Sequence, residues 1–210
     1  MEQDNAEGSS RSVKKLTERQ REVLVGTLLG DGCLAKHGRF PRLHVKHKSA
    51  HRALAELKYE VFRDLVSMAL HEFDQKLADK LYPCVQFATR TSAALSEWHA
   101  RFYQSGKKIV PKDIASLLTP LALAVWLMDD GAADYAGVTF QTHSFRDSEV
   151  EVLVAALESE FELTANSRRN RGGRIIYVQN RSLSRLREVV APHLLPEFDY
   201  KLIERRTRTP

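Results

Sequence analysis

Two apolar segments that end in Asp-Gly constrain this chain more than any other feature of its sequence. They are residues 24–32 (LVGTLLGDG) and residues 123–131 (LAVWLMDDG), and their aspartates Asp31 and Asp130 lie 99 residues apart in a chain of 210. A carboxylate at the C-terminal end of a helix is electrostatically unfavourable, because that end already carries partial negative charge. Two such helices, half a chain apart, indicate a duplicated unit whose acids meet and share a cation.

Capping signals place both segments on helices. A capping box at residues 17–20 predicts a helix over about 18–31 that ends at Gly32, in the left-handed conformation that glycine allows. A Thr-Pro pair at residues 119–120 predicts a second helix that ends at Gly131. Both aspartates are therefore expected in the last turn of their helices.

The segments that follow these helices have the same order in both halves of the chain. Alternating apolar and polar residues predict strands near 43–48, 85–90, 138–142, 163–169 and 174–179. Amphipathic patterns predict helices over about 50–69, 92–104, 147–161 and 182–191. The order helix, two strands, helix, two strands, helix thus occurs twice, with a repeat of about 95 residues.

This repeat predicts an α+β fold of two pseudo-symmetric αββαββα halves with antiparallel sheets. The predicted boundaries are a disordered polar tail over 1–15, an N-terminal half over 16–108, a C-terminal half over 109–204 and a basic tail over 205–210.

Composition favours a nucleic-acid partner. The 32 Lys and Arg residues exceed the 27 Asp and Glu residues, which gives a net charge of +5 and a pI of about 9.2. The two cysteines form no Cys-x-x-Cys pair, which excludes a zinc ribbon and favours a reducing compartment. No membrane-length apolar run or secretory signal is visible, so we expect a soluble intracellular protein, in cytoplasm, nucleoid or an organelle matrix, without membrane contact.

The chemistry predicted for the two acids is metal-dependent phosphodiester hydrolysis. Gly26 and Gly30 lie four residues apart and allow close packing of the helices, which would bring Asp31 and Asp130 together. Two adjacent carboxylates repel, and oxygen-only ligands favour Mg²⁺, Mn²⁺ or Ca²⁺ over zinc. Gly30 and Asp129 complete the predicted metal-site residues, although Asp129 lies about 100° from Asp130 on a helix and is expected to be a neighbour.

A lysine follows the closing helix of each half. Lys108 and Lys201 are predicted catalytic residues, because a cation there polarises a metal-bound water or stabilises phosphate charge. The alternative for either residue is an ordinary surface lysine.

Strand alternation selects the side chains that would face DNA. In 43–48, Leu43 and Val45 point inward and their neighbours outward, and Arg and Gln side chains match the edges of guanine and adenine. The predicted DNA contacts are Lys36, Arg39, Arg42, His44, Lys46, Lys48, Gln86, Arg90, Thr139, Gln141, His143, Arg168, Arg169, Arg171 and Arg174. A solvated basic sheet face is the alternative. Opposite strand parity of His44 and His47 argues against a zinc site formed with His51.

These residues resemble the LAGLIDADG homing endonucleases of the single-chain type with two motifs. Residues 24–32 and 123–131 align with the nine letters of that name, and the eighth letter falls on Asp31 and Asp130. The resemblance covers about residues 16–204 and includes the segments 108–111, 141–145 and 200–202. Thr27 replaces a leucine of the motif, and Val125 and Asp129 replace its small residues in the second copy, so the helix contact is expected to be asymmetric.

The resemblance implies a saddle with a central helix pair, in which each half lays an antiparallel sheet into the DNA major groove. It implies that Asp31 and Asp130 bind metal and that Lys108 and Lys201 flank the active centre. The expected activity is double-strand cleavage at a long non-palindromic site, with short 3′ overhangs, in the service of intron or mobile-element homing. We expect a monomer that uses Mg²⁺, accepts Mn²⁺ and binds DNA without cleavage in Ca²⁺.

Three other functions remain open. An intron maturase, with intron RNA as a partner, or a DNA-binding or RNA-binding protein that lost cleavage would keep the fold. A domain of an intein is a second alternative, although the chain reads as free-standing because it lacks an initial Cys or Ser and a terminal His-Asn. A structural basic protein is the third, and it leaves the duplicated acids unexplained.

Overall fold

A computed structural model describes residues 15–36, 38–66, 68–135 and 137–202. The predicted tails over 1–15 and 205–210 fall outside the described residues, except for Lys15. Among the described residues, no helix combines the length and the apolar character that crossing a membrane requires.

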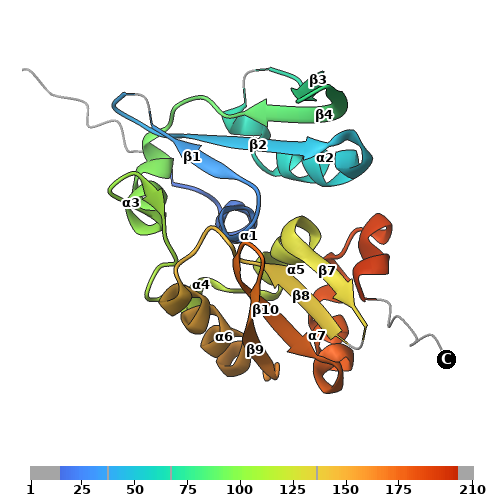
Figure 1. Ribbon diagram of the computed structural model, residues 1–210. Helices are drawn as coiled ribbons and strands as arrows, with labels where there is room; N and C mark the ends of the chain where they lie inside the picture. Colours follow the sequence, from blue (N-terminus) through green and yellow to red (C-terminus); the bar gives the residue numbers. More distant parts are fainter. Residues whose placement is uncertain (1–14, 37, 67, 136, 203–210) are drawn as a thin grey trace, which may run out of the picture.

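The chain forms two halves of similar construction (Figure 1). The first contains α1 (Glu18–Leu29), β1 (Cys33–Ala35), β2 (Arg42–Lys48), α2 (Arg52–Val61), β3 (His71–Leu77), β4 (Lys80–Ala88) and α3 (Ser96–Phe102). The hairpin of β5 (Tyr103–Gln104) and β6 (Lys107–Lys108) and the short α4 (Ile114–Leu117) lead to the second half. That half contains α5 (Pro120–Asp130), β7 (Gly131–Asp134), β8 (Gly137–Gln141), α6 (Asp147–Phe161), β9 (Ala165–Asn170), β10 (Gly173–Gln179), α7 (Leu183–Val190) and the 3-10 helix η6 (Pro196–Leu202).

Each half contains one antiparallel sheet of four strands with the same topology. The strand orders are β1-β2-β4-β3 and β7-β8-β10-β9. In β2 the burial alternates, with Leu43, Val45 and His47 inside and Lys46 and Lys48 exposed. The predicted α+β class with two four-stranded antiparallel sheets is confirmed.

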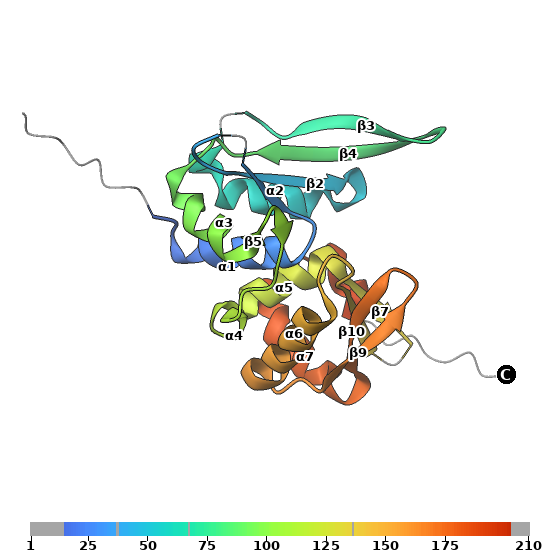
Figure 2. The same cartoon turned by 60° about the vertical axis from the view of Figure 1, so that its left-hand side comes forward.

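The two halves meet along α1 and α5, which lie side by side between the sheets (Figures 1 and 2). Gly26 permits this contact, because a Cβ atom there would lie 2.4 Å from the carbonyl oxygen of Ala122. Gly30 permits it one turn later, because its Cβ would lie 2.5 Å from that of Asp129. α5 is buried from Leu121 to Asp129, so it forms the centre of one core that joins both halves.

The end of α1 differs from the prediction. The helix stops at Leu29 with Gly30 as its cap, at φ −97°, so Asp31 follows the helix and does not lie in its last turn. The amide of Gly32 donates to the carbonyl of Thr27 at 2.9 Å, a wider turn than an α-helix makes. α5 does end at Gly131 as predicted. The left-handed conformation predicted for Gly32 is wrong, because among the described glycines only Gly106 and Gly173 have a positive φ.

Sequence patterns missed some elements and extended others. The strand β3 was not predicted, because His71–Leu77 shows no alternation of apolar residues and its side chains are mostly exposed. α2 ends at Val61, well short of residue 69. The helix predicted over 147–161 is α6, with the same bounds.

Candidate metal centre

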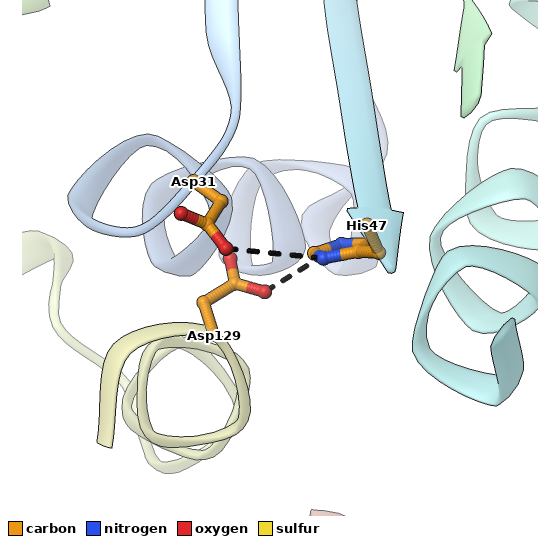
Figure 3. A group of neighbouring side chains, drawn as sticks. All are labelled: Asp31, His47 and Asp129. Carbon is orange, nitrogen blue, oxygen red and sulfur yellow. Dashed lines mark ion pairs between the residues drawn. The ribbon is translucent and has the colours of Figure 1, made fainter. Parts of the chain in front are cut away.

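Three aspartates, Asp31, Asp129 and Asp130, lie at the C-terminal ends of α1 and α5. Asp31 follows α1 and keeps 54% of its side chain exposed, whereas Asp129 is fully buried on α5. Oxygen and nitrogen atoms of Asp31, Asp129 and His47 all lie within 4.8 Å of one another (Figure 3). Asp130 is the last residue of α5 and is partly exposed.

Asp130 lies within the electrostatic reach of the other two acids. Burial and the negative charges of Asp31 and Asp129 raise the pKa of Asp130 to about 7, while Lys108 and Lys201 oppose that rise. Ionised oxygen ligands that repel one another are the donor set that hard divalent cations neutralise. The two motif aspartates, from opposite halves of the chain, therefore lie close enough to influence each other electrostatically.

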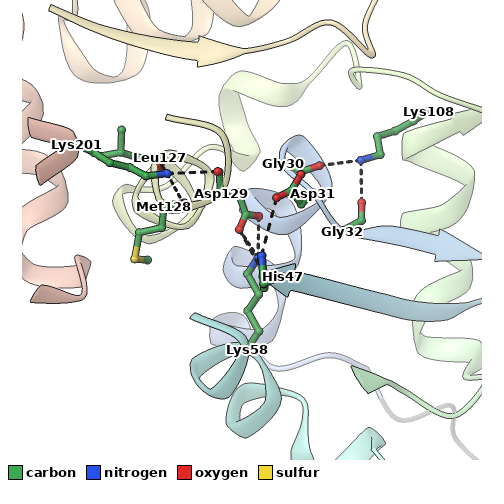
Figure 4. A network of polar contacts seen from close by, with 10 residues as sticks. All are labelled: Gly30, Asp31, Gly32, His47, Lys58, Lys108, Leu127, Met128, Asp129 and Lys201. Carbon is green, nitrogen blue, oxygen red and sulfur yellow. Dashed lines mark hydrogen bonds and ion pairs between the residues drawn. The ribbon is translucent and has the colours of Figure 1, made fainter. Parts of the chain in front are cut away.

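The two predicted lysines lie at matching positions, one at each helix end (Figure 4). Lys108 donates to the carbonyls of Gly30 and Gly32 at 3.0 and 2.8 Å. Lys201 donates to the last carbonyls of α5, at Leu127, Met128 and Asp129. The Leu127 carbonyl also accepts from the amide of Gly131, so Lys201 adds to the cap of α5, and each ammonium offsets the negative end of its helix dipole.

Their environments differ. Lys201 is 4% exposed, and burial lowers its pKa to about 8. Burial also lowers the pKa of Lys108, although its side chain is more exposed and the three aspartates oppose the shift. A lysine with a lowered pKa next to carboxylates is suited to proton transfer near neutral pH.

Two residues of this centre, Lys58 and His47, were not predicted. Lys58 lies on α2 with a fully buried side chain, and its ammonium donates to both oxygens of Asp129 at 2.7 Å. Burial raises the pKa of the Asp129 carboxyl, and this ammonium is the main influence that opposes the rise. The ring of His47, on β2, faces both Asp31 and Asp129, with one ring nitrogen toward each carboxylate (Figure 3).

A signal for Lys58 was present in the sequence. Leu54, Lys58 and Phe62 recur every four residues and form the buried face of α2, so a lysine interrupts an apolar stripe. A lysine on such a face needs a buried acid, and Asp129 is the acid that replaces a small residue in the second motif.

A concave surface connects these acids to the first sheet. Its lining includes Asp31, His47 and Asp129 together with Lys46, Lys48 and Gln75 of the sheet. Lys46 donates to the side-chain oxygen of Gln75 at 3.1 Å, which joins β2 to the unpredicted strand β3.

The predicted DNA-facing residues divide into three groups. The exposed or partly exposed ones in the first half are Lys36, Arg39, Arg42, His44, Lys46, Lys48, Gln86 and Arg90. Those in the second half that keep an exposed or partly exposed side chain on the outer face or at the turns are Gln141, His143, Arg168 and Arg171. The guanidinium of Arg168 lies 3.4 Å from the ring centre of Tyr177, the outward-pointing aromatic residue on β10.

Thr139, Arg169 and Arg174 depart from the prediction: Thr139 has the outward parity of Tyr177 but is buried, and the two arginines have the opposite parity. Thr139 is 5% exposed, and its hydroxyl donates to the carbonyl of Ala132. Arg174 has the parity of the core residues of β10 and forms ion pairs with Asp147 and Glu151 on α6. Arg169 is paired with Arg174 across the strands, so both arginines point to the helix side of the sheet.

The comparisons with known proteins agree with this geometry. Residues 21–186 match the family model described as the LAGLIDADG DNA endonuclease family. The chain is similar to the cytochrome b mRNA maturase bI2 of Debaryomyces hansenii, with 28% identity, covering 90% of this chain and 75% of the maturase. It is also similar to the DNA endonuclease I-ChuI of Chlamydomonas applanata, with 29% identity, covering 89% of this chain and 95% of that enzyme.

A solved structure shares the fold over nearly the whole chain. It is the homing endonuclease I-WcaI bound to its DNA recognition sequence, with a TM-score of 0.86 and 27% identity, covering 90% of this chain and 88% of that one. The family match spans well over half of the 210 residues. This chain therefore belongs to the LAGLIDADG DNA endonuclease family.

Proposed function

We propose that this protein is a site-specific, metal-dependent endonuclease that cuts both strands of DNA. The observation that carries the proposal is that Asp31 and Asp130, one from each half, influence each other electrostatically at the adjoining ends of α1 and α5, at a junction between two sheets with basic outer residues. Burial and the charges of Asp31 and Asp129 raise the pKa of Asp130 to about 7, so its ionised form is destabilised here. A purely structural role does not explain why the chain places acids in such surroundings.

Asp31 and Asp130 are the residues that would hold divalent cations. Their oxygen donors suit Mg²⁺, with Mn²⁺ as a substitute and Ca²⁺ as an ion that supports binding without cleavage. Bound metal would supply an activated water and stabilise charge on the attacking and leaving oxygens. Asp129 is not assigned as a ligand, because both its oxygens accept hydrogen bonds from Lys58.

Lys108 and Lys201 would act beside these acids. Their carbonyl contacts fix each ammonium at a helix end, where it can stabilise the negative charge of a phosphate or exchange a proton with water. The pKa of Lys201, lowered by burial to about 8, favours proton exchange there.

The outer faces of the sheets would read the DNA. The I-WcaI structure contains a bound recognition sequence, and exposed or partly exposed Lys, Arg, Gln and His side chains lie on the outer faces of the sheets and at the turns of the same fold here. The two halves carry different side chains, which favours a long site without palindromic symmetry. One chain contributes both aspartates, so a monomer suffices, and short 3′ overhangs would follow from cutting across the minor groove.

The test is cleavage, in Mg²⁺, of the uninterrupted version of the locus that carries this gene. Asp31→Asn and Asp130→Asn should each abolish double-strand cutting, a larger loss than the roughly 10–100-fold that follows loss of an outer-shell partner. Both variants should still bind the same DNA in Ca²⁺. Normal cutting by both variants would show that these aspartates are not the metal ligands.

Intron maturation is a second candidate function, because the D. hansenii relative is named a maturase. It predicts specific binding of the host intron RNA and faster splicing when the protein is added. Splicing assistance that survives Asp31→Asn and Asp130→Asn, with no DNA cleavage by the parent protein, would favour this function over the nuclease.

A further inference from the structure

A chain of buried polar contacts connects the two halves next to the proposed metal ligands (Figure 4). Lys58 donates to both oxygens of Asp129 at 2.7 Å, and its Nζ lies 3.3 Å from Nε2 of His47. The other ring nitrogen of His47, Nδ1, lies 3.9 Å from Oδ2 of Asp31. Among the described residues, His47 is the only basic side chain within ion-pair distance of that carboxylate.

The position of Lys58 determines which ring nitrogen of His47 carries the proton. An ammonium group has donors and no lone pair, so the nitrogen that faces it accepts. Because Nε2 accepts from the Lys58 ammonium, which lies 3.3 Å away, Nε2 carries no proton, and the ring is the neutral form with a single proton. That proton lies on Nδ1, and Nδ1 faces Asp31.

Lys58 also occupies the place that a metal ion would take between Asp129 and His47. The atoms of Asp31, His47 and Asp129 are close enough to coordinate one ion, but the ammonium is bonded to both Asp129 oxygens. A second cation there would face a buried positive charge at short range. Asp31, which is 54% exposed, is left as the acid of this cluster that is open to solvent.

The second half has no such chain of contacts at the matching positions. Cys33 and Ala132 follow the glycines of the two motifs, and they pair with His44 on β2 and Thr139 on β8. His44 therefore corresponds to Thr139, and residues of β2 and β8 correspond at a shift of 95. The same shift relates the first residues of α2 and α6, Arg52 and Asp147. His47 then corresponds to Thr142, and Lys58 corresponds to Leu153.

Neither Thr142 nor Leu153 can direct a proton toward an aspartate as His47 and Lys58 do. Thr142 is fully buried, and its hydroxyl donates to the carbonyl of Arg174. Leu153 is fully buried in the apolar core. Gly30 occupies the position that matches Asp129, so the ion pair has no counterpart among these positions.

We propose that His47 is a positioning residue for Asp31, held with its Nδ1 proton toward that carboxylate by the Lys58–Asp129 ion pair, and that the C-terminal half lacks this arrangement. The proposal rests on the proposed function, because it takes Asp31 as a metal ligand. Outer-shell groups that hold a ligand carboxylate in one orientation contribute about 10–100-fold to metal affinity or activity.

The first experiment reads the tautomer directly and needs neither metal nor DNA. Two-bond ¹H–¹⁵N spectra of the histidine rings in the metal-free protein should show His47 as the neutral Nδ1–H form, assigned by the signal that His47→Asn removes. Lys58→Met, combined with Asp129→Leu so that no buried charge is left unpaired, should release that preference. An Nε2–H form of His47 in the parent protein would overturn the proposal.

The second experiment compares two substitutions at one position. His47→Asn places an amide N–H near the site of Nδ1, whereas His47→Gln places its amide near Nε2. We expect His47→Asn to cut within about threefold of the parent protein and His47→Gln to lose about 10–100-fold. The loss should fall mainly on one strand, so that nicked circles accumulate from a supercoiled target plasmid, while DNA binding in Ca²⁺ is unchanged.

The outcomes separate this inference from the proposed function. If Asp31→Asn abolishes cutting but His47→Gln and His47→Asn cut alike, then His47 does not position Asp31 and the proposed function stands. If the parent protein does not cut DNA, the proposed function fails. If the parent protein and Asp31→Asn cut equally well, Asp31 is not a metal ligand and the inference fails with that assignment, whatever the histidine variants do. Thr142→Ala, at the matching position of the other half, is the control and should not produce nicked circles.

Discussion

The two halves of this molecule share their topology and differ in the residues next to the helix junction. Both sheets have the same strand order, and each helix end is met by a lysine from later in its own half. Yet Gly30 faces Asp129 across the helix contact, and a buried lysine from the first half neutralises that aspartate. The difference shows that two halves can keep the same topology while only one of them contributes a buried ion pair at the helix junction.

The largest expected effect on stability comes from disrupting the contact between α1 and α5 at Gly26. A methyl group at Gly26 would lie 2.4 Å from the backbone oxygen of Ala122, which cannot move independently of α5. Gly26→Ala should therefore lower the free energy of unfolding by about 3 kcal/mol. The measurement is chemical denaturation, with Gly38→Ala as control because nothing lies within 4 Å of its added methyl. Equal stabilities of the two variants would contradict the close helix contact.

The two lysines at the helix ends should differ in how much they stabilise the protein. Lys201 is 4% exposed and donates to three carbonyls, whereas Lys108 is more exposed and donates to two. Because a buried carbonyl without a partner is costly, we expect Lys201→Met to destabilise the protein by about 2–3 kcal/mol and Lys108→Met by about 1 kcal/mol. Thermal unfolding of both variants in one buffer checks this order, and the reverse order would contradict it.

The ionisation of Asp130 should change the free energy of unfolding by a smaller amount, which depends on pH. Its pKa is raised to about 7, so the folded protein holds a proton on Asp130 that the unfolded chain has lost above about pH 4. Stability therefore falls as pH rises from about 4 through 7, because the folded state binds more protons over that range.

Asp130→Asn removes this ionisation. Without metal, we expect the variant to be more stable than the parent by about 1–2 kcal/mol at pH 8, with the difference shrinking as pH falls to 5. Melting curves at several pH values test this, with the exposed Asp74→Asn as control. A difference that is constant with pH would show that Asp130 has an ordinary pKa.

The smallest expected effect concerns two arginines on opposite faces of the second sheet. Arg168 stacks on Tyr177 on the outer face, whereas Arg174 is paired with Asp147 and Glu151 of α6. Arg168→Ala should weaken DNA binding by about 1 kcal/mol and reduce its salt dependence, whereas Arg174→Ala should leave both nearly unchanged. Binding titrations at several salt concentrations distinguish them, and equal losses would show that strand parity does not determine the DNA face.

The sequence predicted what depends on periodicity and local signals. The order of elements, the close approach at Gly26 and Gly30, and the bounds of α6 followed from apolar spacing and capping residues. β3 was not predicted, because this exposed edge strand shows no alternation of apolar and polar residues. The end of α1 was placed too late, because a turn involving Gly32 replaces the last helical hydrogen bonds.

The predicted site was incomplete because it considered each residue within its own segment. Asp31, Asp130, Lys108 and Lys201 stand out locally, next to glycines or after closing helices. Lys58 and His47 take part only because α2 and β2 of one half reach Asp129 of the other, a contact over 71 residues of sequence for Lys58. The apolar stripe of α2 marks Lys58 as buried, but which acid it meets depends on packing across the two halves, which no local pattern reports.

The most direct test of the account is the position of the metal itself. A crystal structure of the protein with its target DNA and Mn²⁺ should show anomalous scattering at the carboxylates of Asp31 and Asp130, next to the scissile phosphates, with Lys58 still bonded to Asp129. A metal ion bound between Asp129 and His47 with Lys58 displaced, or no ion near Asp31 and Asp130, would contradict the account.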